Sequence, residues 1–577
     1  MSDAVRIQRL DVPPLPEGVA TIGKEGLVRR SFDHVSQGRL LRCHVRERLV
    51  LSIEFTETTE DALVLMYTNL ESRDGSWRGI PFRRAGNRYI FSVRPTRTGV
   101  FGFRVKYSFD RGSTWIWDRA PLISVHVDPE EMKDVRCYTF IPNVSGKVEH
   151  WIRELDRIGR LGFNMVHLLP VTEMDFSESP YSAKNLFAFD PAYYDTSRYK
   201  DGMSAFETFV NAAKKKGMAL CIDLVLNHIG PGSDVATKHP DWIMADRNEK
   251  DGMKRSGCWH MNAWLKWGDL VKIDYNHANE EKRDAVWEYM KAYALFWANY
   301  AAFTGGMVRL DNLHNSDEDF IEEVLFTLRK AYPDLVIHAE FFSDANTMLK
   351  RARDWDINLF LANQWEYPYA ENLREYLTYI HEISDQVALY TPVTSHDTGS
   401  PVQLFGSKDA VVTRYFITAL FATGKTGFVQ GAEHGVDEKV TFIGRNRPFP
   451  YKEDPWIVDR ITRINRILAS DDTFRCSQNL SFVDDHHGAI LAAYRRSHDG
   501  GGVLLMANLD TTNPHLFTVD LEAETGWARH QLIDLMDEAA PLDATELCEF
   551  TIPPSGVAAY RVSRLPYSTQ NREMSVL

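Results

Sequence analysis

Residues 305–315 read GGMVRLDNLHN, an apolar stretch in which Arg309 and Asp311 stand two residues apart. In a strand, residues i and i+2 share one face, so both charged side chains point the same way. Charged side chains are almost never fully buried unless they are paired, because an unpaired buried charge is costly. We therefore interpret this stretch as a buried strand whose two charges belong to a site.

Short apolar segments of this kind recur along the middle of the chain, where predicted strands alternate with amphipathic helices. The eight strand candidates are CYTFIP (137–142), FNMVHLLP (163–170), MALCIDLVLN (218–227), GGMVRLDN (305–312), LVIHAEFF (335–342), INLFLAN (357–363), ALYTPVTSHD (388–397) and TGFVQGAE (426–433). Eight strand–helix units favour a closed parallel (β/α)8 barrel of the α/β class over an open sheet. One helix is predicted over Ser204–Lys216, with Ser204 and Glu207 as its capping box and Gly217 as its stop.

Two β-rich segments flank this barrel. Alternating apolar residues and turn signals predict an N-terminal β-sandwich within residues 1–130, and the barrel is assigned to residues 131–474. Residues 475–577 contain the hairpin pattern GAILAAYRRSHDGGGVLLMANLD and are predicted to form a small antiparallel β-domain that closes near residue 564, followed by a loose tail. The connection after the third barrel strand, at about 229–278, is unusually long, and long loops tend to be functional.

Composition excludes several classes of protein. The net charge of −14 argues against a nucleic-acid partner, whose binding surface is normally basic. No run approaches the ~18 to 20 apolar residues of a membrane span. The first residues lack the basic and apolar regions of a secretory signal, and the six cysteines form no C-x-x-C pair, so a cytoplasmic location with reduced thiols is predicted. The oligomeric state is left open.

Polar residues stand at the carboxyl ends of the predicted strands, where barrels of this kind carry their active sites. They are Asp223, Asn227 and His228 after the third strand, Arg309 and Asp311 after the fourth, Glu340 after the fifth, and His396 and Asp397 after the seventh. We expect Asp223 to pair with Arg309, and the guanidinium to lower the pKa of Asp311. Retaining glycosidases use one carboxylate as nucleophile and a second as proton donor. Asp311 beside Arg309 suits the first role, and Glu340, which precedes two phenylalanines, suits the second.

These motifs resemble a known family. DLVLNH, GMVRLDNLH, HAEFF and TSHD are similar, in order and position, to the four signature regions of glycoside hydrolase family 13, the α-amylase family, and SPYSAKNLFAFDP and IDYNHANEEKR resemble two further regions. The resemblance implies that Asp311 is the nucleophile, Glu340 the general acid/base and Asp397 the third carboxylate, which holds sugar hydroxyls. It also implies substrate contacts by Tyr181, Asp223, His228, Arg309, His314 and His396. The substrate would be an α-glucan or malto-oligosaccharide, cleaved with retention of the α configuration.

Two expectations about the surroundings of the site remain open at this stage. The insert carries CWHMNAWLKWGD, in which Trp259 and Trp267 are candidates for stacking on sugar rings, although these aromatics could equally form the insert's own core. Asn227 could be a ligand of a structural calcium ion, but the rest of an oxygen cage is not evident, so no cofactor is expected.

Sequence does not decide between water and a sugar hydroxyl as the group that resolves the covalent intermediate. We predict hydrolysis of α-1,4-glucosidic bonds in malto-oligosaccharides, glycogen or starch-like glucans. The alternative is a 4-α-glucanotransferase or maltosyltransferase, because VRLDNLHN, HAEFF and GRLGFNMVHLLPVTEM resemble the glucanotransferase half of glycogen debranching enzymes and, to some extent, bacterial maltosyltransferases. A non-catalytic glucan-binding protein is a distant third reading, which the complete set of three carboxylates disfavours.

Overall fold

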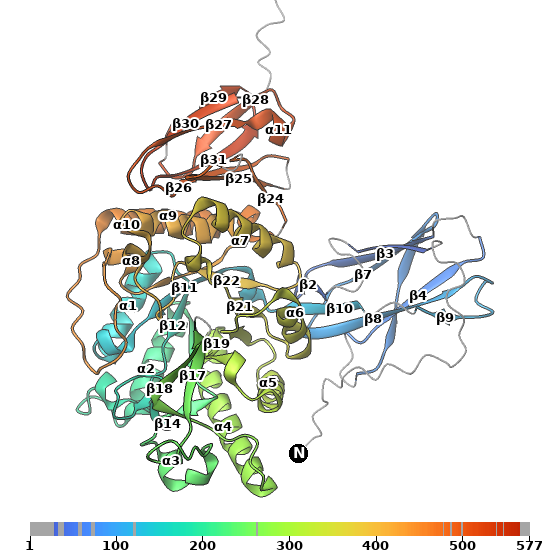
Figure 1. The fold of residues 1–577 in the computed structure, drawn as a ribbon. Helices are drawn as coiled ribbons and strands as arrows, with labels where there is room; N and C mark the ends of the chain where they lie inside the picture. Colours follow the sequence, from blue (N-terminus) through green and yellow to red (C-terminus); the bar gives the residue numbers. More distant parts are fainter. Residues whose placement is uncertain are drawn as a thin grey trace, which may run out of the picture.

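The computed structural model describes residues 28–32, 40–55, 60–70, 75–118, 123–260, 263–476, 478–484, 487–497, 500–537, 539–545 and 547–565. A central barrel carries a β-sandwich on one side and a second β-domain on another (Figure 1). The tail predicted beyond residue 565 lies outside the described residues. In the described part of the chain, no helix has both the length and the apolar character needed to span a membrane.

Eight parallel strands close the barrel, as predicted, and each predicted strand contributes one of them. In barrel order they are β11 (Val135–Phe140), β12 (Met165–Leu168), β15 (Ala219–Leu224), β19 (Met307–Leu310), β20 (Val336–Ala339), β21 (Leu359–Leu361), β22 (Leu389–Pro392) and β23 (Lys425–Val429). The start of β19 requires a glycine, because a Cβ on Gly306 would lie 2.0 Å from the carbonyl oxygen of Leu220 on the neighbouring strand. Close backbone packing at this point sets the position of Arg309 and Asp311.

Helices surround the barrel. They are α1 (Val148–Arg160), α2 (Gly202–Lys215), α4 (Glu280–Thr304), α5 (Glu318–Ala331), α6 (Ala345–Asp354), α7 (Ala370–Ile383), α8 (Pro401–Phe405), α9 (Ala410–Phe416) and α10 (Pro455–Ser470). The predicted capping box of α2 was wrong by one turn. Asp201 is the N-cap and Ser204 is its N3 partner, because the aspartate side chain accepts the backbone N–H of Ser204.

Short elements lie at the carboxyl end of the barrel strands. A hairpin of β13 (Thr172–Met174) and β14 (Ala183–Phe189) follows β12. The long connection after β15 forms a three-stranded sheet of β16 (His228–Ile229), β18 (Ala263–Lys272) and β17 (Arg255–His260), together with α3 (Asp234–Lys238). The insert is therefore an ordered layer beside the strand ends.

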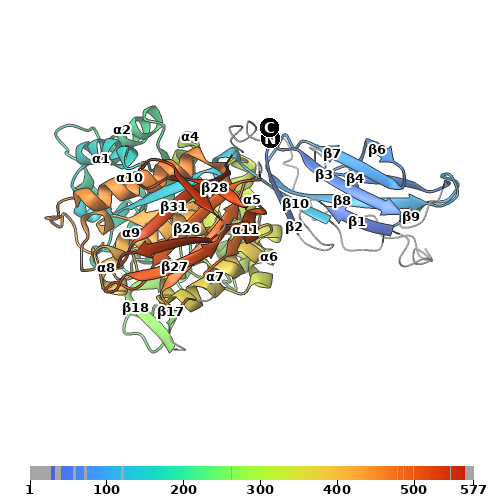
Figure 2. The same ribbon diagram turned by 90° about the horizontal axis from the view of Figure 1, so that it is seen from above.

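The N-terminal β-sandwich is confirmed as two sheets. One has the order β1-β3-β7-β6 and the other β2-β10-β8-β4-β5, with β9 paired to β8. Their strands are β1 (Val28–Phe32), β2 (Leu40–His44), β3 (Leu49–Phe55), β4 (Leu63–Thr68), β5 (Arg78–Ile80), β6 (Phe82–Ala85), β7 (Arg88–Val93), β8 (Gly99–Ser108), β9 (Ile116–Trp117) and β10 (Ile123–Asp128). Viewed from above, the sandwich projects away from the barrel (Figure 2). Arg42 anchors its base, because it pairs with Asp128 and donates to the carbonyl of Asn358 in the barrel.

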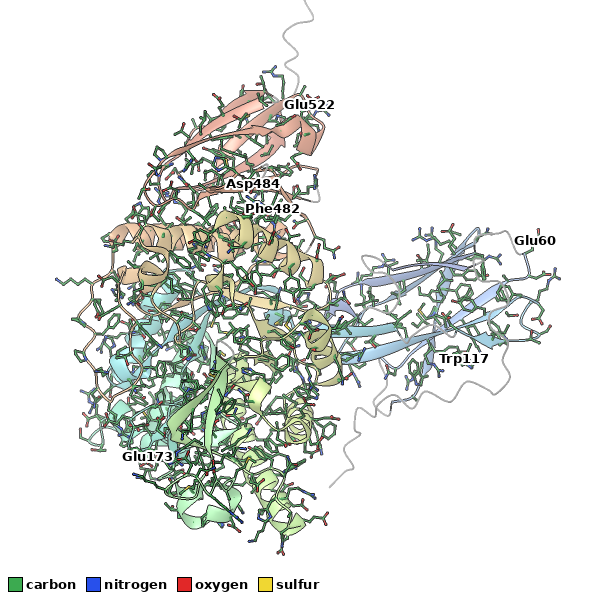
Figure 3. All side chains as sticks on the ribbon, in the orientation of Figure 1. Glu60, Trp117, Glu173, Phe482, Asp484 and Glu522 are labelled. Carbon is green, nitrogen blue, oxygen red and sulfur yellow. The ribbon has the colours of Figure 1, made fainter. Side chains whose placement is uncertain are left out.

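The C-terminal β-domain is antiparallel, as predicted. A sheet of order β24-β25-β26-β31-β28-β29 faces a two-stranded sheet, β27-β30. The strands are β24 (Leu480–Phe482), β25 (Ile490–Arg496), β26 (Gly502–Asn508), β27 (His515–Asp520), β28 (Arg529–Asp534), β29 (Leu542–Thr545), β30 (Leu547–Ile552) and β31 (Val557–Arg564), with the short helix α11 (Leu521–Thr525) after β27. Asp484, at the junction with the barrel (Figure 3), accepts hydrogen bonds from the buried Arg374 of α7. This buried ion pair fixes the domain against the barrel.

Candidate active site

Arg309 is the centre of the site. Its side chain is 3% exposed and lies on β19, where the alternation of the strand turns it into the barrel. One guanidinium nitrogen, Nη1, donates to Asp223 Oδ2 at 2.5 Å and to Asp311 Oδ1 at 3.1 Å. The other, Nη2, donates to Glu340 Oε2 at 2.7 Å. One cation therefore joins the carboxylates of three neighbouring strand ends, and the predicted pairing of Asp223 with Arg309 is confirmed.

Asp223 is the most heavily bonded of these carboxylates. Besides Arg309, its Oδ2 accepts a hydrogen bond from the Tyr181 hydroxyl at 2.9 Å and lies 3.2 Å from His167 Nε2. Although burial raises the pKa of this carboxyl, Arg309 and His167 outweigh burial and hold it well below its ordinary value. Asp223 is thus a permanent anion that orients the arginine and the tyrosine.

Asp311 differs from the prediction. Burial raises its pKa well above the ordinary aspartate value, Glu340 and Asp223 raise it further, and the opposing effect of Arg309 does not offset them. The reason is geometric, because Arg309 divides its positive charge among three carboxylates and stands closer to Asp223 and Glu340 than to Asp311. Arg309 does lower the pKa of Asp311, as predicted, but burial and the neighbouring carboxylates outweigh this effect, so the pKa is raised on balance. An ionised Asp311 is under-compensated, which makes it a more basic and less solvated oxygen nucleophile.

Glu340 is held by a second donor besides Arg309. The backbone N–H of Asn312 donates to Glu340 Oε2 at 2.8 Å. Asn312 follows Asp311 and adopts a left-handed conformation with φ of 47°, which asparagine tolerates better than most residues. The side chain of Glu340 is 17% exposed, against 9% for that of Asp311, so it lies nearer the opening of the site.

His396 and Asp397 approach from the loop after β22. The rings of His396 and Tyr181 are parallel, with centroids 5.6 Å apart, and His396 Nε2 lies 2.6 Å from the Tyr181 hydroxyl. Burial and the nearby Arg309 lower the pKa of His396 well below 6.5, so the ring is neutral. Asp397 Oδ2 lies 3.2 Å from the same nitrogen, and its side chain is half-exposed, in reach of a ligand.

The remaining predicted contacts lie in the insert and in the loop after Asp311. Trp267 packs edge-to-face against the buried His228, with ring centroids 5.9 Å apart. Trp259 lies in β17 opposite Trp264, but its side chain lies outside the described residues. His314 lies in the single 3₁₀ turn Leu313–Asn315, with its ring 6.4 Å from that of Phe342. The structure brings Trp267 and His228 together and places His314 on the side of Glu340.

The calcium expectation rests on Asn227. Its Nδ2 donates to the carbonyl of Asn312 at 3.0 Å, and its buried Oδ1 has no hydrogen bond to a described residue. Among the residues that the structure describes, no group of three or more His, Cys, Asp or Glu side chains is arranged to hold a metal ion. One amide oxygen does not fit the six to eight oxygens that calcium requires, so no step below uses a metal.

Three side chains of the site were not predicted. His167 on β12 contacts Asp223, and its polar character within the apolar FNMVHLLP was the signal that could have identified it. Phe442, from the loop after β23, packs against Tyr181 and His396 at 5.7 Å and 5.5 Å between ring centroids. Lys439 from the same loop donates to the Asp397 carbonyl at 2.7 Å. No motif marks these last two, because their positions depend on how the loop folds back.

The sequence is similar to several known proteins. Residues 130–249 match the family model of the glycogen debranching enzyme, glucanotransferase domain. An α-1,4-glucan:maltose-1-phosphate maltosyltransferase from Chlorobaculum tepidum is 22% identical over 430 residues, which cover 69% of this chain and 60% of that protein. The chain thus matches about three-fifths of the length of such relatives.

Two solved structures have the same fold. An α-amylase from Geobacillus thermoleovorans, complexed with acarbose, aligns with a TM-score of 0.60 at 14% identity and covers 75% of this chain and 99% of that one. A debranching enzyme from Nostoc punctiforme aligns with a TM-score of 0.57 at 16% identity, over 75% of this chain and 99% of that one. The chain therefore shares the fold of these two enzymes, and part of its sequence is similar to a glucanotransferase domain.

Proposed function

We propose that the protein is an α-retaining transglycosylase that moves an α-1,4-linked glucosyl or maltosyl segment from a donor to a sugar hydroxyl. The observation that carries this proposal is the guanidinium of Arg309, which joins Asp223, Asp311 and Glu340 at the ends of three strands. The preference for transfer over hydrolysis is supported by the match to a glucanotransferase domain and by relatives that are maltosyltransferases.

The reaction takes two displacements. The ionised carboxylate of Asp311 attacks the anomeric carbon, the bond to the leaving oxygen breaks, and Glu340 gives that oxygen its proton. Glu340, now a carboxylate, removes a proton from the acceptor hydroxyl, whose oxygen attacks the anomeric carbon and releases Asp311. Two inversions leave the α configuration unchanged. Asp397 and His396 would hold hydroxyls of the distorted sugar, and Tyr181 would stack against its ring.

Product analysis tests the proposal. The protein is incubated with maltoheptaose alone and with added glucose, and products are separated by chain length while reducing ends are counted. Transfer predicts chains longer than maltoheptaose at a constant number of reducing ends. Only shorter sugars, with reducing ends increasing in step, would make water the acceptor and the protein a hydrolase. A parallel incubation with maltose 1-phosphate and maltoheptaose, in which free phosphate is measured, examines a phosphorylated donor.

Two substitutions test the assigned roles. Asp311→Asn and Glu340→Gln should each leave a folded protein without measurable turnover, because each removes one participant in the proton and bond exchange. Glu318→Gln is the matched control, since Glu318 is exposed in the first turn of α5 and pairs only at the surface with Arg351. A substantial residual rate in either site variant, with an intact circular dichroism spectrum, would contradict the assignment.

A further inference from the structure

A groove lies beside the catalytic end of the barrel, between α6 and α7, and belongs to none of the sites described above. Its volume is about 470 Å³, which lies within the ~300–1,000 Å³ of small-molecule sites. Its floor is apolar and includes Met348, Leu361 and Leu389. Its walls are aromatic, and Asn363, Asn372 and Glu375 add polar groups to its lining.

One end of the groove starts at the catalytic acid. Phe341, Phe342 and Ser343 line it and directly follow Glu340 in the chain. Two residues of extended chain span at most about 7 Å, so Phe342 lies close to Glu340. The ring of Phe342 is 41% exposed and contacts that of His314, which places it between the groove and the loop that follows Asp311. One end of the groove therefore lies next to the side of the site on which Glu340 would act.

That side is the acceptor side. In the second displacement Glu340 must remove a proton from the attacking hydroxyl, so the incoming sugar has to lie within hydrogen-bond reach of this carboxylate. The transferred segment of the donor, in contrast, would lie on the far side of the anomeric carbon, toward Tyr181 and Asp397, whereas its leaving segment departs from the acceptor side. A sugar chain whose end reaches Glu340 from outside would extend past Phe342 into the groove.

The far wall of the groove consists of three tyrosines. Tyr367 stacks nearly parallel on Tyr376, with centroids 4.3 Å apart and planes at 18°, and Tyr379 follows one turn later on α7 at 6.1 Å from Tyr376. The Tyr376 hydroxyl donates to Asn363 Oδ1 at 2.9 Å and accepts from its backbone N–H, which fixes the ring. The hydroxyls of Tyr367 and Tyr379 make no hydrogen bond to any residue that the structure describes. Such half-buried rings offer flat faces for the C–H surface of a sugar ring, and hydroxyls and a carboxylate for its hydroxyl groups.

We propose that this groove binds the acceptor α-glucan, with Tyr367 and Tyr379 as stacking residues and Glu375 as a hydroxyl partner. This inference rests on the proposed transglycosylase function and deepens it, because a built acceptor site holds a sugar hydroxyl at Glu340 in competition with water. The groove then sets the affinity for the acceptor, while the three carboxylates carry out the chemistry.

The test separates acceptor binding from catalysis. Transfer from maltoheptaose to radiolabelled maltotriose is measured at varied maltotriose concentration, and release of reducing ends reports transfer to water. Tyr379→Ala should raise the KM for maltotriose about 5- to 10-fold, the loss expected for one aromatic contact, and leave kcat at saturating maltotriose unchanged. Tyr379→Phe keeps the ring and should stay within about twofold of the parent. Tyr369→Ala is the matched control, since Tyr369 is the N-cap residue of α7, is 73% exposed and does not line the groove.

An unchanged acceptor KM in Tyr379→Ala, or an equal rise in Tyr369→Ala, would overturn the inference while leaving transglycosylation intact. If the wild-type protein transfers only to water, the proposed function fails, and the groove is then judged by binding. Maltotriose is titrated by calorimetry into Asp311→Asn and into Asp311→Asn/Tyr379→Ala. A higher Kd for maltotriose in the double variant supports a glucan site in the groove, and an unchanged Kd overturns that inference.

Discussion

Replacing Arg309 by lysine separates the positive charge of this side chain from its shape. The guanidinium reaches Asp223 at 2.5 Å and Glu340 at 2.7 Å from two different nitrogens. A lysine ammonium places its charge on a single nitrogen and cannot match a planar fork, so at least one of the two bonds is lost. The net charge of the buried cluster stays the same, and the orientation of the carboxylates changes.

The expected loss follows from the strength of one such bond. A hydrogen bond to a charged group contributes about 1.5–3 kcal/mol. Because each ~1.36 kcal/mol of lost transition-state stabilisation lowers the rate tenfold, kcat/KM should fall about 10- to 160-fold. The exposed fraction of Arg309 is only 3%, so water cannot enter easily to replace the missing donor.

The assay is initial-rate kinetics on maltoheptaose, with the melting temperature measured for the same preparations. Arg42→Lys is the matched control, since Arg42 is also buried and paired with an aspartate, Asp128, but lies at the base of the sandwich. Both variants should lose thermal stability, and only Arg309→Lys should lose kcat/KM. A kcat/KM for Arg309→Lys within about threefold of wild type, less than one charged hydrogen bond is worth, would refute the reasoning.

Three further perturbations follow from buried groups and from the insert. Asp311→Asn should raise the melting temperature at about pH 8 and lose most of that gain near pH 4. The reason is that the pKa of Asp311 is raised in the folded state, so the ionised carboxylate destabilises the fold and the protonated one does not. Thermal scans across pH measure this, and a gain that grows on acidification would contradict it. Burial lowers the pKa of Lys425 from 10.5 to about 8, so the charged amine destabilises the fold below about pH 8 and this effect disappears as pH rises through 10.5. Lys425→Met should therefore raise the free energy of unfolding at neutral pH, by up to about 3 kcal/mol, with no gain left near pH 10.5 in denaturant titrations. Trp267→Ala should raise the KM for the glucan donor about 3- to 10-fold, whereas Trp264→Ala on the same hairpin should change this KM less than about twofold. Equal effects of the two substitutions would indicate that both tryptophans have a structural role only.

The barrel could be predicted because its strands are short, apolar and separated by helical periodicity, a pattern that few other folds share. The pairing of Asp223 with Arg309 could also be predicted, because two neighbouring parallel strands in register bring their inward-facing side chains together, and Asp223 and Arg309 are register partners of β15 and β19. Both inferences depend only on local alternation and on the order of the strands.

What could not be predicted depends on contacts between distant segments. Phe442 and Lys439 reach the site from a loop that begins after β23, and nothing in their local sequence marks them. The groove between α6 and α7 requires that two helices leave a gap, which amphipathic periodicity does not encode. The capping box of α2 was placed one turn late because Ser204 has the residue type of an N-cap, and Asp201, with the same property, competes for that position.

The raised pKa of Asp311 has the most direct bearing on mechanism. Sequence predicts that the arginine two residues away also pairs with Asp223, but not that the same guanidinium binds Glu340 as well. Four carboxylates, those of Asp223, Asp311, Glu340 and Asp397, therefore meet two cations, Arg309 and Lys439, and the buried His396 is neutral. In the proposed mechanism, with Glu340 protonated and Asp311 ionised for attack, three carboxylates face two cations, so the site keeps an excess of negative charge.

That excess destabilises the resting protein and suits the reaction. The transition state of glycosyl transfer resembles an oxocarbenium ion, so positive charge develops at the anomeric carbon, next to Asp311. A site with an uncompensated negative charge binds that cationic transition state more strongly than the neutral substrate. Only such differential binding lowers the activation free energy of the reaction. The arrangement of one arginine among three carboxylates is thus better understood as a compromise than as a stabilising network. A second cation beside Asp311 would stabilise the fold and, by the same electrostatics, slow the first displacement.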